Sequence, residues 1–327
     1  MALCCAPGCG PESDPVRGRM PDPPKPPPAY PPARIAPLDP QLQEAARKEL
    51  DSALHAGDPN VRAHALEAVR QTMGTRRAND VIAALGDRDP LVRYAACLAA
   101  GELELKDAHD KLRHLVEDKD MRVGVVARFA MHRIGDYRYS HDLEKLSRDP
   151  DPAVRGTTAM VLGMIGDPSG LKVLRGMRLD PHPAVRQQAA EAMWRLGSEE
   201  GLEELVGWSI SGFQEDRMIG LLGLAAPRNH NVIEHLRGGL VTDSPVVSLV
   251  AARALGMIGC DEGYGVALRG AKSADPQQRL LAAFAFGSIG RSDAQEVLRK
   301  LLADADPNVR VAAAQAILQL KPDFKPE

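Results

Sequence analysis

Aromatic residues and long apolar runs are scarce in this sequence. Aromatic side chains make up 4% of its 327 residues, whereas hydrophobic residues make up 44%. A core of this composition is filled by Ala, Leu, Val, Ile and Met, which is typical of close-packed helices. The most apolar stretch, residues 280–290, is shorter than the roughly 20 residues that a membrane-spanning helix needs. The composition therefore indicates a large helical core and excludes a transmembrane helix.

Cysteine is also scarce, and basic charge is not in excess. Cys97 and Cys260 lie far apart in the chain, so a disulfide between them is not expected. The net charge is −3 and the isoelectric point is near 6.3. Bulk charge therefore gives no reason to expect a surface that binds nucleic acid.

A motif of the form Asp-Pro-x-Val-Arg recurs along the chain in strict register. Its arginine position falls at 62, 93, 124, 155, 186, 217, 248, 279 and 310, a spacing of 31 residues without insertion. Arginine occupies seven of these nine positions, and Gly124 and Ser248 occupy the other two. Proline stands three residues before the arginine position in seven units. Such a register indicates a protein of about nine repeats.

Each unit predicts two helices joined by a turn. An aspartate stands where a helix N-cap belongs, and the proline after it suits the first helical position. Small and apolar residues then recur at helical spacing, as in Val154, Thr158, Leu162 and Ile165, and Gly166 marks the helix end. A shorter second helix follows, and no segment alternates with period two, so no strand is expected. The predicted caps are Asp58, Asp89, Asp151, Ser244, Asp275 and Asp306.

Stacking these units predicts an all-α fold, an α-solenoid or superhelix of helix–turn–helix repeats over residues 41–321. One helix pair cannot bury its own apolar face, but stacked neighbours can. We expect the motif arginine to pair with the cap aspartate of its own or an adjacent unit and so to fix the stacking register. The sixth unit departs from the pattern with Gln214, Asp216 and Pro227, so we expect an irregularity or bend there.

The consensus DPxVRxxAAxxLGxIGD resembles the short HEAT-like repeat, also called the phycobilisome-lyase-type HEAT repeat. The resemblance covers about residues 41–321 and implies a solenoid whose motif-bearing helices line the concave side. Family members that attach bilins imply an alternative function in handling a bilin or another hydrophobic ligand, although none of their catalytic residues maps onto this chain. Deoxyhypusine hydroxylase, another HEAT-like family, binds iron through paired His-Glu dipeptides, and this chain contains none.

Catalytic chemistry is not evident in the sequence. Single histidines such as His64, His132 and His235 lie in different units, and His109-Asp110 and His141-Asp142 are the nearest approach to a metal-binding pair. There is no phosphate-binding glycine loop and no nucleophile elbow. We therefore expect a protein that is not an enzyme and that holds no metal or cofactor.

The amino-terminal segment predicts an extended leader. Residues 1–40 hold 13 of the 26 prolines, which favours a polyproline-like tether over a helix. APGC, ending at Cys9, resembles a bacterial lipobox, and Cys9 would be lipidated if a basic, apolar leader lay upstream. A disordered leader without lipid is the alternative. Localisation stays open between a membrane-anchored extracytoplasmic lipoprotein and a cytoplasmic protein, and residues 322–327 form a short tail.

The solvent-facing positions of the motif helices are apolar in units two to four and six to eight. Basic residues are few there, so nucleic-acid binding is not expected. The terminal units instead carry polar residues such as Gln71 and Gln315, as solubilising caps do. Gln187 and Glu191 interrupt the stripe in unit five. The predicted partner-binding residues are Tyr94, Leu98, Val125, Phe129, Met160, Met164, Met218, Leu222, Leu249, Leu280 and Phe284.

A contiguous apolar stripe on a solenoid predicts an interaction surface. We therefore expect a non-enzymatic, monomeric scaffold or adaptor that binds a protein or peptide partner on the concave face. The competing interpretation is that strong curvature buries these positions against neighbouring units.

Overall fold

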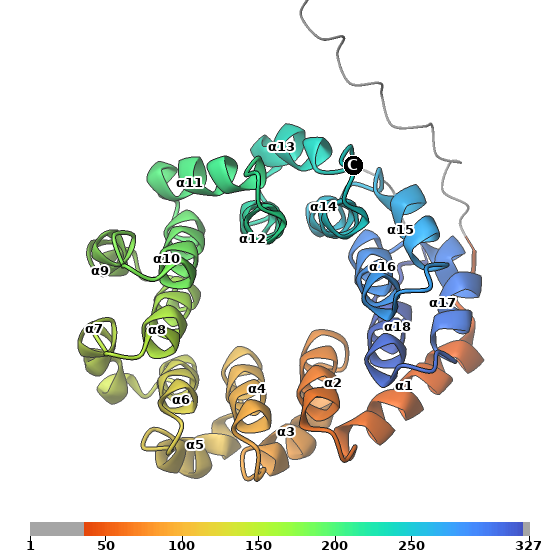
Figure 1. Ribbon diagram of the computed structural model, residues 1–327. Coiled ribbons are helices and arrows are strands. Elements are labelled where there is room, and N and C mark those ends of the chain that lie inside the picture. Colours follow the sequence, from red (N-terminus) through yellow and green to blue (C-terminus); the bar gives the residue numbers. More distant parts are fainter. Residues whose placement is uncertain (1–35, 323–327) are drawn as a thin grey trace, which may run out of the picture.

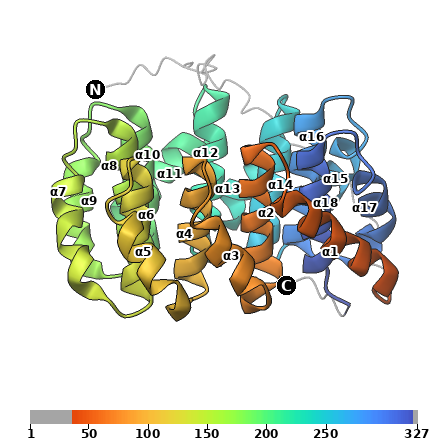
Figure 2. The same cartoon turned by 90° about the horizontal axis from the view of Figure 1, so that it is seen from below.

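The two helices of each repeat lie in two concentric layers of a closed ring (Figure 1). The computed structural model describes residues 36–322. The motif-bearing helices form the inner layer, where they stand next to one another around the ring and run roughly parallel to its axis (Figure 2). They are α2 (Pro59–Thr72), α4 (Pro90–Glu102), α6 (Met121–Arg133), α8 (Pro152–Ile165), α10 (Pro183–Arg195), α12 (Gln214–Ala225), α14 (Pro245–Met257), α16 (Pro276–Ile289) and α18 (Pro307–Gln319).

The outer layer consists of the second helices, most of which are short. They are α1 (Pro40–Leu54), α3 (Ala78–Ala84), α5 (His109–Leu115), α7 (Leu143–Leu146), α9 (Leu171–Met177), α11 (Glu199–Ser209), α13 (Ile233–Gly238), α15 (Tyr264–Gly270) and α17 (Gln295–Leu301). Residues 36–322 contain no strand, and one isolated bridge joins Arg291 to Lys321. The predicted all-α solenoid is confirmed.

The predicted capping residues begin the inner helices. Asp58 accepts a hydrogen bond of 2.8 Å from the backbone N–H of Asn60, and Ser244 accepts one of 3.4 Å from Val247. Gly166 ends α8 at a φ of +80°, a conformation that favours glycine. The other predicted aspartates cap their helices in the same way, and Asp120 adds a further cap. These capping aspartates are Asp58, Asp89, Asp120, Asp151, Asp275 and Asp306.

The motif arginine links adjacent repeats through a different carboxylate from the one expected. Arg155 Nε and Nη2 donate to the two oxygens of Asp180 at 2.6 and 2.8 Å, and Nη1 donates to the carbonyls of Asp149 and Pro150. Asp180 lies 25 residues beyond the arginine and two residues before the next cap position. The expected pairing with a cap aspartate is therefore wrong, because the Asp151 side chain already accepts the helix N–H. The same bidentate pair joins Arg62 to Asp87, Arg93 to Asp118 and Arg279 to Asp304.

Arg128 replaces this latch in the third unit, where the motif position is Gly124. Its Nη1 donates to the carbonyls of Val116 and Gly124 at 2.7 and 3.0 Å, and its Nη2 lies 3.4 Å from Asp142. A Cβ at Gly124 would lie 2.8 Å from the Val116 carbonyl oxygen. The arginine has thus moved one turn along α6, and glycine leaves room for it.

Helix α1 occupies the ninth outer position and closes the ring. It packs against α18, the last inner helix, and against α2. Leu50 of α1 stands 31 residues before Val81, so it holds the position that an apolar residue holds in the second helix of each repeat. Leu50 is fully buried, as are Val81 and Leu298. Helix α1 therefore covers the face of α18 that an open stack would leave to solvent.

Polar side chains that the sequence assigns to end caps instead meet across this seam. Gln315 and Gln319 both donate through Nε2 to Gln71 Oε1, at 2.9 and 3.0 Å. Arg310 Nε donates to Glu49 Oε1 at 2.8 Å. Gln315 is only 3% exposed, so the expectation of solvent-facing caps is wrong. The curvature accumulated over nine repeats brings α18 against α2.

Residues 36–39 dock on the ring ahead of α1. The Ala36 N–H donates to Ser292 Oγ at 3.0 Å, the Asp39 N–H donates to Gln295 Oε1 at 2.6 Å, and Arg299 pairs with Asp39 at 2.7 Å. The ordered array thus begins before residue 40. The predicted lipidation site at Cys9, the rest of the leader and residues 323–327 lie outside the described residues.

Helix α12, the inner helix of the sixth unit, stands apart from α10 at a corner of the inner wall (Figure 1). This is the unit in which the sequence predicts an irregularity. Helix α12 packs closely on α11, since a Cβ at Gly220 would lie 2.4 Å from the Ser209 nitrogen. Trp194 Nε1 donates to the Leu224 carbonyl at 3.1 Å and ties α10 to α12.

A double-mutant cycle tests the latch. Arg155→Ala and Asp180→Ala should each lower the free energy of unfolding by about 2 kcal/mol, because each leaves a mostly buried charge unpaired. Their coupling should be about 1 kcal/mol, whereas Arg155→Ala and Asp151→Ala should be additive. Denaturant titration measures these values. Coupling to Asp151 in place of Asp180 would contradict the assignment.

Acid should weaken the latches. Arg155 lowers the pKa of Asp180, and Arg279 lowers the pKa of Asp304, each from an ordinary value of 3.8. A carboxyl with a lowered folded-state pKa contributes stability that is complete above its unfolded value and is lost as pH falls through the folded one. The free energy of unfolding should therefore drop below about pH 4, and Arg155→Ala should show a smaller drop. An equal drop in both proteins would contradict this assignment.

Candidate interaction surface

The predicted concave residues divide into a buried set and a half-buried set. Val125, Phe129 and Leu249 are at most 1% exposed, so they fill the wall and do not line its surface. A Cβ at Gly101 would lie 2.8 Å from the Phe129 ring, and one at Gly270 would lie 2.6 Å from Leu249. For these three residues the prediction of a partner-binding role is corrected. The other eight, which are half-buried, are Tyr94, Leu98, Met160, Met164, Met218, Leu222, Leu280 and Phe284.

Close packing around the ring explains the burial of this stripe. Tyr94 on α4 reaches past α6 to α8, where its hydroxyl lies 3.6 Å from the sulfur of Met160. Burial raises the pKa of Tyr94 to about 12. The curvature of the closed ring brings side chains of alternate inner helices into contact. The sequence predicts an open groove, with burial by strong curvature as the competing interpretation. The sequence alone does not give the curvature that decides between the two.

Large exposed apolar side chains lie elsewhere, on the rim of the ring where the inner helices begin. Leu179, Ile210 and Val241 are 77%, 77% and 53% exposed. Each stands seven residues before the motif arginine position of its unit, so three consecutive repeats place them side by side. The same position in the other six units is polar or small: His55, Gly86, Glu117, Arg148, Lys272 and Ala303. The aligned repeats of the sequence contain this signal, although the predicted partner-binding residues lie only on the concave face.

Phe213 extends this row of residues by replacing a capping aspartate. It holds the N-cap position of α12, makes no side-chain capping bond and is 72% exposed. A side chain that cannot cap costs a helix about 1 kcal/mol relative to aspartate. The sixth unit thus exposes an aromatic ring at the expense of helix stability. We call Leu179, Ile210, Phe213 and Val241 the rim ridge.

A cavity of about 350 Å³ opens beside the ridge at the corner between α10 and α12. We call it the corner notch. Trp208, which is half-buried on α11, lines it together with the exposed ring of Phe213. Its full lining is Pro183, Arg186, Gln187, Trp208, Phe213, Glu215 and Asp216. The notch exists because α12 leaves α10 and packs on α11.

Two carboxylates without a cation partner among the described residues border the notch. Asp216 accepts hydrogen bonds from Gln187 Nε2 at 3.1 Å and Ser211 Oγ at 3.0 Å, which fix its orientation. Glu215 is exposed at the start of α12. Arg186 also lines the notch, but its Nη1 donates to the carbonyls of Asp180 and Pro181. The notch therefore combines aromatic walls with unpaired negative charge.

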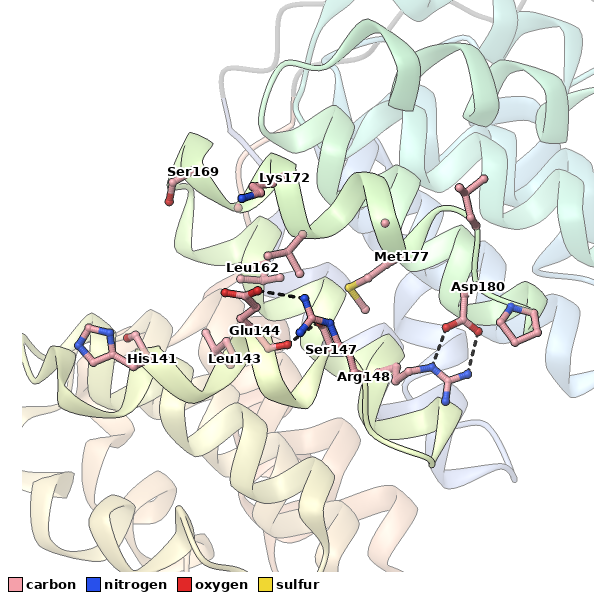
Figure 3. A pocket seen from close by; sticks show the side chains of 17 residues that line it. His141, Leu143, Glu144, Ser147, Arg148, Leu162, Ser169, Lys172, Met177 and Asp180 are labelled. Atoms are coloured by element: carbon pink, nitrogen blue, oxygen red, sulfur yellow. Dashed lines mark hydrogen bonds and ion pairs between the residues drawn. The ribbon is translucent and has the colours of Figure 1, made fainter.

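A larger groove of about 700 Å³ lies between α7 and α9 on the outer surface (Figure 3). Leu162 and Met177 lie in its middle. Helix α7 on one side of the groove has only four residues. The apolar cluster behind α9 on the other side is separate from the main core. Arg148 pairs with Glu144 at 3.0 Å, and the latch of Arg155 and Asp180 forms one end. These charges are satisfied within the fold, so the ridge and notch are the stronger candidate.

Two of the histidines hydrogen-bond to neighbouring side chains. His109 Nε2 is 3.2 Å from Asp136 Oδ2, and His132 Nδ1 is 3.0 Å from Ser140 Oγ. Across residues 36–322, no three His, Cys, Asp or Glu side chains are grouped so that they could hold a metal ion. The same residues include no helix long and apolar enough to span a bilayer.

The family profile of HEAT repeats matches residues 43–131, 141–211 and 266–324. The chain belongs to the HEAT-repeat family. The unmatched residues 212–265 include the irregular sixth unit and the exposed Phe213.

Individual relatives are more distant. Deoxyhypusine hydroxylase-B of Oryza sativa subsp. japonica is 30% identical over 129 residues, which cover 39% of this chain and 40% of that protein. The chain therefore spans less than half the length of this relative.

Two solved structures are similar in outline. The complex of CpcE and CpcF of phycocyanin lyase from Nostoc sp. PCC7120 has a TM-score of 0.45 at 21% identity, covering 72% of this chain and 95% of that one. Human deoxyhypusine hydroxylase in complex with glycerol has a TM-score of 0.39 at 17% identity, covering 85% and 96%. Both scores are low, so neither similarity bears on the function of this chain.

Phe213→Asn should stabilise the protein although it removes a large apolar side chain. Asparagine can cap α12 and should add about 1 kcal/mol to the free energy of unfolding. Phe213→Ala, which removes the ring without adding a cap, should change it by less than about 0.5 kcal/mol. Thermal or denaturant unfolding measures both. An Asn variant no more stable than the Ala variant would contradict the assignment of a vacant cap, and an Ala variant clearly less stable than wild type would show that Phe213 packs on the fold.

Proposed function

We propose that this HEAT-repeat ring is a non-enzymatic scaffold that binds a protein partner through the rim ridge and the corner notch. The observation that supports this most directly is the register of Leu179, Ile210 and Val241, which three consecutive repeats expose at a position that is polar or small elsewhere. Exposed apolar side chains gathered in one place on a soluble protein mark interaction sites.

The notch indicates the chemistry of the partner. Trp208 and Phe213 offer aromatic surface to an apolar anchor side chain, and aromatic residues are enriched at the centres of interfaces. Glu215 and Asp216 favour a lysine or arginine beside that anchor. The partner segment is therefore apolar with a basic residue. This proposal moves the binding surface from the concave face to the rim, and the half-buried inner positions stay a secondary candidate.

Affinity capture from the native cells tests the proposal. Ile210→Ser combined with Phe213→Asn should lose the specific partners that the wild-type protein retains. The ridge residues are exposed, so the variant should melt no lower than wild type, and loss of capture cannot come from unfolding. The matched control is Leu91→Ser, which changes a 43% exposed residue on the same rim outside units five to seven. This control should retain the partners.

An inner-wall variant separates the two surfaces. Met164→Gln with Leu222→Gln changes half-buried concave positions and should not affect capture. Loss of partners in this variant, together with full capture by the ridge variant, would overturn the rim assignment in favour of the concave face.

A further inference from the structure

Four consecutive inner helices place unlike side chains at one repeat position around the seam. Arg253 on α14, Phe284 on α16, Gln315 on α18 and Glu67 on α2 each stand five residues after the motif arginine position. The guanidinium of Arg253 lies 4.6 Å from the centroid of the Phe284 ring. His64 on α2 contacts the same ring, with centroids 5.3 Å apart. We call Arg253, Phe284, Gln315 and His64 the seam cluster.

Arg253 is a half-buried cation without a counterion. No carboxylate of residues 36–322 lies within ion-pair distance of it, and its Nε is buried without a hydrogen-bond partner. Burial lowers the pKa of Arg253, and the negative charge of Glu67 opposes that shift. A cation withdrawn from water is costly unless an anion pairs with it. The face of Phe284 compensates only part of that cost.

Two more buried polar atoms of the seam cluster lack partners. They are His64 Nε2 and Gln315 Oε1. The amide nitrogen of Gln315 is engaged with Gln71, which leaves its oxygen as an acceptor. Arg253 and His64 share the Phe284 ring, and Gln315 lies on α18, the helix between α16 and α2. Buried side-chain polar atoms in folded proteins are nearly always satisfied, so these three orphans call for a ligand or ordered solvent.

Glu67 does not satisfy the cation. Its carboxylate is engaged by Arg70 and by Gln71 of the same helix. Arg253 and His64 therefore still lack a negatively charged hydrogen-bond acceptor, and the Gln315 oxygen still lacks a hydrogen-bond donor.

We propose that the seam cluster binds an oxyanion, either a carboxylate or a phosphate, that carries a proton or an adjacent N–H. Arg253 and His64 donate to its oxygens, Gln315 accepts from its donor, and Phe284 forms the floor. The side chains of Arg253, His64 and Phe284 are each half-buried. The site is distinct from the rim ridge and does not depend on the function proposed there.

Binding should be visible at His64. Burial is the main factor that lowers the pKa of His64, and the charge of Arg253 lowers it further, while a side-chain hydrogen bond with Asn308 and the charges of Glu67 and Asp306 raise it. A bound anion stabilises the imidazolium, so its pKa should rise when the site fills. NMR of the full chain with labelled histidine measures this pKa, and the His64→Gln variant assigns the signal. The probes are inorganic phosphate and N-acetylglycine, each compared with sodium chloride at equal ionic strength.

The expected result is a saturable shift of the His64 signal with at least one probe. A response to phosphate alone indicates a phosphate ligand, and a response to N-acetylglycine indicates a carboxylate beside an N–H. Arg253→Gln should weaken binding at least tenfold. Arg195→Gln, which changes an inner-wall arginine already paired with Glu191, should not affect it. Arg253→Lys, which keeps the charge, should bind with intermediate affinity. It serves as the test at this position if the Gln variant does not fold.

A wild-type protein that responds no more to either probe than to chloride would overturn the proposal and leave solvent as the partner of these atoms. Unchanged affinity in both folded Arg253 variants would overturn it as well.

Discussion

The contact of α1 with α18 is the constraint on which the rest of the structure depends. A stack of two-helix repeats leaves an apolar face at each end, and such ends need a polar cap or a partner. Here Leu50 continues the apolar register of the outer helices at one end of the array, and α18 presents an inner helix at the other. Joining them buries both faces at once. A ring of nine repeats then needs no capping unit.

Closure also determines which surfaces are available for binding. Inside the ring, apolar side chains contact side chains of the next helix but one, as Tyr94 on α4 contacts Met160 on α8. These contacts leave little apolar surface exposed. Large apolar side chains stay exposed on the rim, where the inner helices begin. Leu179, Ile210 and Val241 are exposed there, and Phe213 is exposed at the expense of a helix cap. At the seam, polar groups from both ends of the array meet, which places Arg253 and His64 around one phenylalanine.

The sequence predicted the local structure well, because caps, helix ends and repeat length are properties of short segments. Asp58 and Gly166 were identified from their chemistry alone. The latch was wrong in its partner because Asp151 and Asp180 recur equally regularly, and only the structure shows that the cap oxygen is already engaged. Ring closure was missed because it depends on a small rotation summed over nine repeats. That same omission made Phe129 and Leu249 seem accessible, although they pack against Gly101 and Gly270.

Ring closure in solution is the claim to test first. Spin labels at Lys48→Cys on α1 and Lys300→Cys on α17 lie on exposed positions of two helices that meet only across the seam. Cys4, Cys5 and Cys9 would be replaced by serine, and Cys97 and Cys260 are buried. Double electron–electron resonance then measures the distance between the labels. A closed ring predicts one narrow population at short distance, whereas a broad population at long distance would show that the array is open.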